Sequence, residues 1–200
     1  MLPGKGEIHL CQKLLRDARF LAFQLAADRV VAAEVRERGC VECDGALHSA
    51  NFTRKPRGGP AGIAPEADVR FSLCCAEDGC RTRHTPSSLR FLGRKVYLGA
   101  VVVIVSAMRH GATPARMRKL RDVLGVSRRT VERWRAWWRA TFAESRCWRE
   151  VAGRFVPVVA TDRLPVSLLE RFQGDDEARV TALLRLLAPI TGGVALVHAR

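Results

Sequence analysis

The sequence lacks an apolar segment long enough to cross a membrane. Its longest apolar run, from Val96 to Met108, has thirteen residues and includes Tyr97 and Ser106, whereas a membrane-spanning helix needs about 20. The first residues carry acids and bases where a secretion signal would have an unbroken apolar stretch. We therefore expect a cytoplasmic protein with no membrane partner.

Acidic residues are scarce relative to basic ones. The chain has 34 Lys and Arg against 20 Asp and Glu, which gives a net charge of +14. Most of this excess lies in residues 109–149, where twelve basic residues stand against three acids, whereas residues 7–38 are nearly neutral. Such an excess favours a polyanionic partner, with nucleic acid ahead of an anionic membrane surface. A solvated helical surface is the alternative, but such surfaces usually mix the two signs.

An even disulfide framework is also missing, because the chain has seven cysteines and no secretion signal. Two close pairs, Cys40-x2-Cys43 and Cys75-x4-Cys80, have the spacing of a structural zinc site, which takes four ligands in a tetrahedron. The two residues between the first thiolates let backbone amides turn toward the sulfurs, and Gly45 eases the turn. We expect one Zn²⁺ in a reducing compartment.

Other arrangements of these cysteines stay open. Cys74 competes with Cys75 as a ligand, although Cys75 should share the inward face of Leu73 on a strand. His84 can replace a cysteine, or the cluster can be a set of reduced core thiols. A catalytic zinc would need an open site and a nearby general base. The sequence contains no His-x-Glu pattern, so we expect a closed, structural site.

Hydrophobic periodicity predicts a mainly α fold with a small β zinc ribbon. A strand over 69–73 should pair with 46–53, and the apolar stripe of the helix over 175–187 should pack within the chain rather than against a second copy. The expected helices cover 7–38, 91–109, two segments that begin near Pro114 and Ser127, 164–172 and 175–187. The last ten residues should be loose. The predicted units are an N-terminal helix (1–39), a zinc ribbon (40–89), a trihelical helix-turn-helix (90–149) and C-terminal helices (150–200).

The segment from Leu120 to Trp134 has the pattern of a helix-turn-helix. Gly125 stands at the turn, Ser127 can cap the following helix, and the apolar positions that hold the two helices together are Leu120, Leu124, Val126, Val131 and Trp134. One departure is Arg121, which stands where a small residue usually lets the helices approach. Trp138 and Phe142 should continue the buried face of the last helix.

The exposed face of that last helix, about residues 128–142, should read DNA. Arg129 and Arg133 lie one turn apart, and arginine can bind guanine O6 and N7 with two hydrogen bonds in the major groove. The other basic residues of the two helices are better placed for backbone phosphates; they are Arg116, Arg118, Lys119, Arg128 and Arg135. Trp137 should pack in the core rather than stack on bases.

The order of these parts resembles the N-terminal region of bacterial insertion-sequence transposases, in which a zinc ribbon precedes a trihelical helix-turn-helix. The resemblance covers residues 40 to about 145, and its motifs are Cys40-x2-Cys43, Arg70-Phe-Ser-Leu-Cys-Cys75, Gly79-Cys80-Arg81, Thr85-Pro-Ser-Ser88 and Arg90-Phe-Leu-Gly-Arg-Lys-Val-Tyr97. Such transposases continue into a ribonuclease-H-like catalytic domain with three metal-binding carboxylates. Only fifty-five residues follow Ser145 here, too few for that domain.

We therefore predict a non-enzymatic, zinc-stabilised protein that binds double-stranded DNA and lies on the nucleoid when bound. It would be a regulator, an accessory subunit or a remnant of a mobile element, with a homodimer or a transposition protein as a possible partner. The first alternative is a protein-interaction module that holds a partner with its ribbon and terminal helices. The second is a metal-dependent nuclease that uses carboxylates the sequence does not place.

Overall fold

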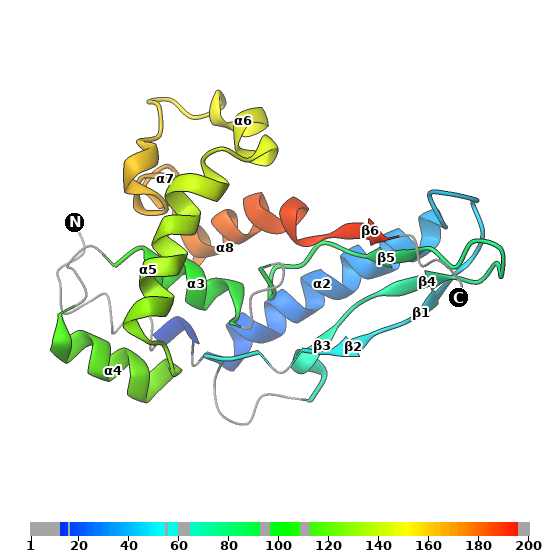
Figure 1. Ribbon diagram of the computed structural model, residues 1–200, viewed down its shortest axis with the longest axis horizontal. Coiled ribbons are helices and arrows are strands. Elements are labelled where there is room, and N and C mark those ends of the chain that lie inside the picture. The colour runs from blue at the N-terminus through cyan, green and yellow to red at the C-terminus, as the bar shows by residue number, and fades with distance from the viewer. Residues whose placement is uncertain are drawn as a thin grey trace.

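The computed structural model describes residues 13–15, 17–54, 56–59, 65–92, 97–108 and 113–195. The described chain combines a helical body with small antiparallel sheets that extend to one side of it (Figure 1). The predicted fold class is thus confirmed at this level: helices dominate, and a small antiparallel sheet accompanies a group of four cysteines. Within the described ranges, no helix has both the length and the apolar composition that crossing a membrane requires.

Seven helices, four short or irregular helical turns and six strands carry labels. The helices are α2 (Ala18–Arg38), α3 (Gly99–Ser106), α4 (Pro114–Leu124), α5 (Arg128–Ala136), α6 (Arg146–Ala152), α7 (Val166–Leu169) and α8 (Asp176–Leu187). The turns are η1 (Pro65–Asp68), η2 (Trp137–Phe142), η3 (Thr161–Arg163) and η4 (Ala188–Thr191). The strands are β1 (Leu47–Ser49), β2 (Phe52–Thr53), β3 (Val69–Arg70), β4 (Leu73–Cys75), β5 (Arg83–Thr85) and β6 (Gly193–Ala195).

The strands form a four-stranded antiparallel sheet in the order β1-β4-β5-β6 and a two-stranded sheet of β2 and β3. The predicted pairing of 46–53 with 69–73 is confirmed, because Ser49 stands opposite Leu73 and Phe52 opposite Arg70. The expectation of a loose C-terminal end is wrong for β6, in which Gly193 pairs with Thr85 of β5. Its partner lies more than a hundred residues earlier, so no local pattern reveals it.

Helix α2 runs alongside the sheets (Figure 1). Asp17 caps its first turn by accepting a hydrogen bond from the Arg19 N–H. Gly39, with a φ of 78°, ends it as predicted. The predicted helix over 7–38 is therefore described only from Ala18 onward, with a separate helical turn at 13–15, and its part before Lys13 lies outside the described residues.

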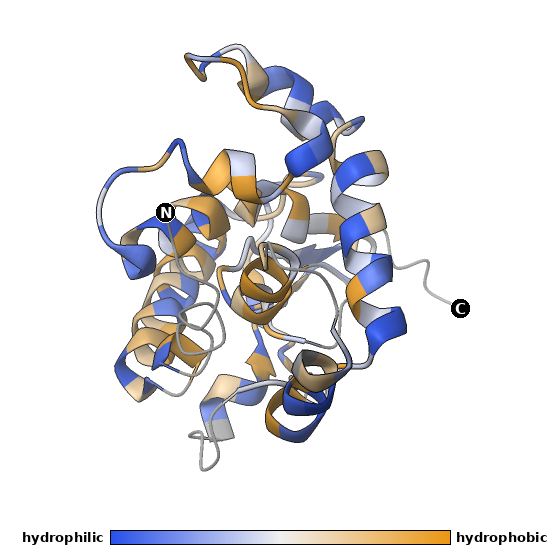
Figure 2. Cartoon of the chain, turned by 90° about the vertical axis from the view of Figure 1, so that its left-hand side faces the viewer, coloured by the Kyte–Doolittle hydropathy of each residue, from blue (hydrophilic) through white to orange (hydrophobic). Residues whose placement is uncertain are grey.

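Helix α3 is the centre of the hydrophobic core. All eight of its residues are buried, and Figure 2 shows this apolar helix in orange, enclosed by the other helices. It is shorter than the predicted helix over 91–109, because Phe91 instead forms a β-bridge with Leu98. The apolar stripe of α8 packs within the chain, as predicted: Val180, Leu183, Leu184 and Leu187 are all buried in the same core.

A buried ion pair joins α2 to the segment that leads into α3. The carboxylate of Asp28 lies 2.9 Å from Nε of Arg90, and both side chains are at most 1% exposed. The Ser88 hydroxyl and the Leu89 N–H each donate to the same carboxylate at 2.6 Å. Burial lowers the pKa of Arg90, and the charge of Asp28 opposes that shift. Such a pair fixes the register between α2 and the core, and losing one partner leaves an uncompensated buried charge.

Candidate metal centre and basic helices

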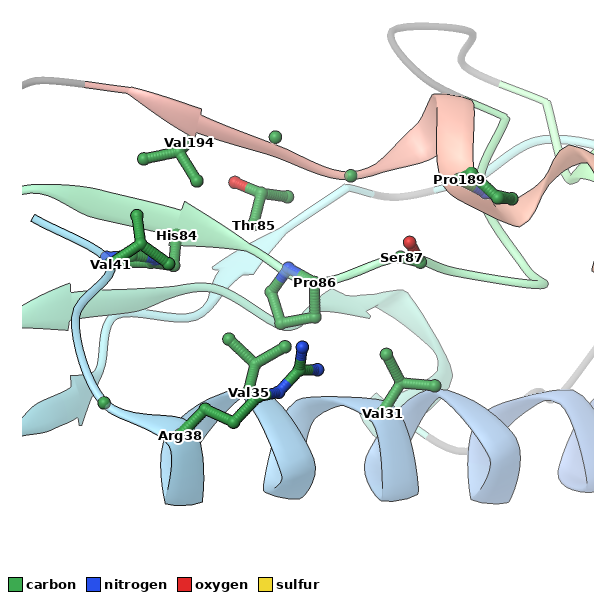
Figure 3. A pocket seen from close by; sticks show the side chains of 13 residues that line it. Val31, Val35, Arg38, Val41, His84, Thr85, Pro86, Ser87, Pro189 and Val194 are labelled. Carbon is green, nitrogen blue, oxygen red and sulfur yellow. The ribbon is translucent and has the colours of Figure 1, made fainter. Parts of the chain in front are cut away.

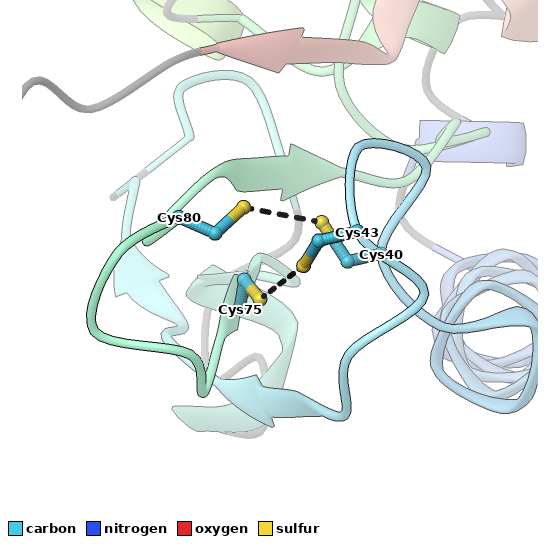
Figure 4. A group of neighbouring side chains, drawn as sticks. All are labelled: Cys40, Cys43, Cys75 and Cys80. Carbon is cyan, nitrogen blue, oxygen red and sulfur yellow. Dashed lines mark hydrogen bonds between the residues drawn. The ribbon is translucent and has the colours of Figure 1, made fainter.

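Four cysteines from two distant segments meet at the outer end of the four-stranded sheet (Figure 4). The Sγ atoms of Cys40 and Cys80 are 3.6 Å apart, and those of Cys43 and Cys75 are 3.4 Å apart. All four sulfurs lie within 4.8 Å of one another. A disulfide would need about 2.05 Å, whereas sulfurs around a tetrahedral zinc with bonds of about 2.3 Å are about 3.8 Å apart. The cluster is consistent with a bound metal ion, and these are the four predicted ligands.

Each pair is held in a tight turn that directs backbone N–H groups at the sulfurs. The N–H groups of Gly45, Glu77 and Thr82 favour the thiolates of Cys43, Cys75 and Cys80, which stand two residues before them. Backbone hydrogen bonds close both turns: the Asp44 N–H donates to the Cys40 carbonyl at 2.8 Å, and the Cys80 N–H donates to the Glu77 carbonyl at 2.9 Å. The prediction that the spacing turns amides toward the sulfurs is therefore met.

The thiols compete for negative charge in the absence of a cation. The Gly45 N–H lowers the pKa of Cys43, but the neighbouring thiols outweigh it and raise that pKa to about 12. Burial raises the pKa of Cys75, whereas a hydrogen bond with the Thr82 hydroxyl lowers the pKa of Cys80 to about 7. Four thiolates this close cannot all ionise on their own. A divalent cation would remove this conflict, because it binds the ionised form of each thiol.

Little apolar packing supports the cysteine cluster (Cys40, Cys43, Cys75 and Cys80). Among the described residues, the buried hydrophobic group around it holds only Leu47 and Leu73 besides two of the cysteines, with Val35 packed against it. So small a core rarely stabilises a fold by itself, and small units usually add a metal or disulfides. The packing thus favours a structural role for the metal.

The alternative ligands lie outside the cluster. Cys74 points to the other face of β4, where its thiol contacts the Arg81 carbonyl at 3.5 Å. His84 is buried on β5, and its Nε2 lies 3.4 Å from Sγ of Cys40 without completing the group of four. The parity expectation for Cys75 is met, since it is buried on the same face as Leu73.

Gly45 is required by close packing inside the cluster. A Cβ at this position would lie 3.2 Å from Sγ of Cys43 and 3.3 Å from Sγ of Cys75. It would also lie 2.7 Å from Cγ of Glu77, at the other turn. Any larger residue therefore pushes the two cysteine pairs apart.

Helices α4 and α5 meet at a short turn over residues 125–127. Gly125 adopts a φ of 65°, a left-handed conformation that suits glycine. Ser127 accepts a hydrogen bond from the Thr130 N–H and so caps α5, as predicted. Tyr97, which precedes α3, donates its hydroxyl to the Gly125 carbonyl at 2.7 Å, so the turn is fixed against the core.

The apolar side of α5 and η2 is buried as the sequence indicates. Val131, Trp134, Trp138 and Phe142 are each at most 3% exposed. Trp134 meets Tyr97 edge to face, with ring centroids 5.0 Å apart. Trp137 lies beside Trp138 and is half-buried. These rings leave the opposite side of α5 to solvent.

The predicted DNA-contacting residues occupy two neighbouring helices. Arg129 and Arg133 are exposed on α5, and Arg118 and Lys119 are exposed on α4. The remaining three differ in their surroundings. Arg128 is exposed and pairs with Glu132 at 2.9 Å, Arg135 is half-buried and donates to the Met108 carbonyl at 2.5 Å, and the side chain of Arg116 lies outside the described part.

Two cavities were missed by the sequence analysis, because their walls come from segments far apart in the chain. One has a volume of about 380 Å³ and lies between α2 and the loop after β5, where Val31 and Val35 face Pro86 (Figure 3). The other has a volume of about 410 Å³ and lies between the end of α3, α5 with η2, and η3. Its wall carries three arginines, one of which is Arg135.

The chain was compared with protein-family models, with curated proteins and with solved structures, and none of them matches it. Its function is therefore carried by the chemistry of its own residues.

Proposed function

We propose that the protein is a zinc-stabilised DNA-binding protein. The observation that carries this proposal is the exposed basic surface of α4 and α5 next to their fixed turn. Arg118, Lys119, Arg129 and Arg133 are all exposed there, while the opposite sides of both helices are buried in the core. A helix that presents two arginines one turn apart fits the major groove, and cations on the preceding helix fit the flanking phosphates.

The proposed zinc has a structural role. It would be held by Cys40, Cys43, Cys75 and Cys80 and would supply only charge and geometry. With four sulfur ligands the coordination is complete, which leaves no position for water or substrate. The proposal therefore assigns the protein no catalytic activity.

The resemblance to transposase N-terminal regions places this DNA binding in a mobile element. Under this proposal the protein is a regulator or an accessory subunit, with double-stranded DNA as its first partner and a second copy or a transposition protein as another. The net charge of +14 supports a polyanionic partner.

The test begins with selection of bound sequences from a random pool of duplex DNA by the full zinc-loaded chain. Binding to the selected and to a scrambled duplex is then measured over a range of salt concentrations for Arg129→Ala, Arg133→Ala and Lys119→Ala. Losing an arginine–guanine contact should cost about 1–3 kcal/mol at one base position. Losing a phosphate contact should weaken both duplexes alike and lower the salt slope by about one.

Arg38→Ala is the matched control, because Arg38 is an exposed cation at the far end of α2, beside the sheets (Figure 1). It should leave both affinities unchanged. If Arg129→Ala and Arg133→Ala weaken both duplexes equally, α5 does not read sequence. If no variant differs from the Arg38 control, DNA binding is refuted and the protein-interaction alternative takes its place. Magnesium-dependent cleavage of the duplex would instead favour a nuclease.

A further inference from the structure

The cavity between α3, α5, η2 and η3 has the chemistry of an anion site. Its volume is about 410 Å³, and Arg135, Arg139 and Arg163 line it together with one acid, Asp162. The arginines come from α5, η2 and η3, so the fold rather than the local sequence gathers them. Three guanidinium groups around one hollow repel one another unless an anion lies between them.

The charges of the wall do not cancel. Glu170 lies 3.3 Å from Arg163 and balances it, and Asp162 balances one of the other two arginines. One positive charge is left over. Arg139 is exposed and has no hydrogen bond or ion pair with any described residue, whereas Arg135 is steadied by the Met108 carbonyl.

A second, independent observation comes from Ser106. Its side chain lines the same cavity and is only 4% exposed, yet its hydroxyl has no hydrogen-bond partner. Buried hydroxyls are nearly always paired, and leaving one unpaired is unfavourable. A ligand oxygen in the cavity would give this hydroxyl the acceptor it lacks.

We propose that this cavity binds a phosphate group, with Arg139 and Arg135 supplying N–H donors and Ser106 supplying its hydroxyl. Planar guanidinium groups match phosphate oxygens in charge and in spacing. The other cavity fits no anion in this way, because valines from α2 line it and the Nε2 of His84 is already in contact with Cys40.

The phosphate has two possible sources with the same chemistry. It is either a backbone phosphate of bound DNA or the phosphate of a small molecule. The proposal does not depend on the DNA-reading face of α5, because Arg129 and Arg133 do not line the cavity. Phosphate binding can therefore succeed where sequence-specific DNA binding fails, and the reverse.

The test is calorimetric titration of the full zinc-loaded chain with inorganic phosphate at constant ionic strength. Arg139→Gln should raise Kd about tenfold, and Ser106→Ala should raise it about threefold. Arg149→Gln removes an exposed arginine of α6 that does not line the cavity, and Kd should not change. Without phosphate, Ser106→Ala should not lower Tm, because the hydroxyl has no partner to lose.

Competition identifies the source. If phosphate displaces duplex DNA and Arg139→Gln lowers the salt slope of DNA binding, the ligand is a DNA phosphate. If phosphate and DNA bind together, the ligand is a small phosphorylated molecule. The proposal is overturned if the native chain and Arg139→Gln bind phosphate equally, or if Arg149→Gln weakens binding as much as Arg139→Gln does.

Discussion

The Nε2 of His84 lies 3.4 Å from Sγ of Cys40, although the two residues are 44 positions apart in the chain. Both side chains are buried, and burial lowers the pKa of His84, so the imidazole is neutral at pH 7. A neutral imidazole can donate one N–H to a thiolate. His84 thus supports a metal ligand from outside the group of four.

This contact predicts different outcomes for two variants. Cys40→Ser should lose the bound zinc, because it removes one of four ligands. His84→Ala should keep one zinc per chain but bind it about 10–100-fold more weakly, as is usual when a group that orients a ligand is removed. Cys74→Ser should match the native chain. Elemental analysis of purified protein and competition with a chelator measure both effects, and zinc lost from His84→Ala but kept in Cys40→Ser would reverse the assignment.

A glycine pair tests the geometry of the cluster. Gly45→Ala should weaken zinc binding, because its Cβ would crowd the sulfurs of Cys43 and Cys75. Gly79→Ala is the control, since a Cβ there meets no atom within 4 Å. The measurement is zinc affinity by chelator competition. Equal affinities for the two variants would show that the sulfurs do not need the observed approach.

Removal of the metal should unfold the region it holds. Chelation should expose the amides of β1, β4 and β5, because metal binding and folding are coupled where the apolar core is small. The helical core around α3, which has its own large apolar cluster, should keep its protection. Hydrogen exchange followed by mass spectrometry reads both regions in one experiment. Unchanged protection of β4 after chelation would contradict a structural role.

The buried ion pair predicts a large loss of stability on removing one charge. Asp28→Asn leaves the Arg90 guanidinium uncompensated in the core and should lower the free energy of unfolding by about 3–5 kcal/mol. Glu150→Gln breaks the exposed pair with Arg146 (2.7 Å) and should change stability little. Urea denaturation of the zinc-loaded chain compares them, and similar midpoints would mean that the buried pair contributes no more than the surface pair.

The turn between α4 and α5 offers a local test. Gly125→Ala places a side chain at a φ of 65°, which costs about 1–2 kcal/mol for an L-residue. Gly153→Ala is the control, because Gly153 ends α6 at a φ of −67° with open space around it. Thermal unfolding should show a lower Tm for Gly125→Ala only. A matching loss of DNA affinity at a temperature where the variant is folded would tie the turn to binding.

Several features were predictable because they depend on short-range chemistry. The spacing of Cys40, Cys43, Cys75 and Cys80 follows from what a tetrahedral site requires, and the structure brings these four sulfurs together. The cap at Ser127 depends only on a side chain and the backbone N–H three residues later. Hydrophobic periodicity located α8 and the buried face of α5. The domain boundaries and the DNA-contacting residues stay predictions.

Long-range polar contacts were not predictable. Asp28 occupies a helical position that a hydrophobic pattern assigns to the surface, and only its distant partners Ser88, Leu89 and Arg90 explain its burial. Arg70 is likewise buried, where it donates to the carbonyls of Pro86 and Thr191. The unpaired hydroxyl of Ser106 could not be anticipated either, since apolar residues precede it along α3.

The pairing of β5 with β6 also orders events during synthesis. Thr85 leaves the ribosome more than a hundred residues before its partner Gly193, and at about 5–20 residues per second the sheet waits roughly 5–20 s for its last strand. All four cysteines are already outside by then, so a metal can load while β5 still has a bare edge. A nascent chain that stops in this interval would carry a finished metal centre beside an open strand, which is a template for joining another such chain.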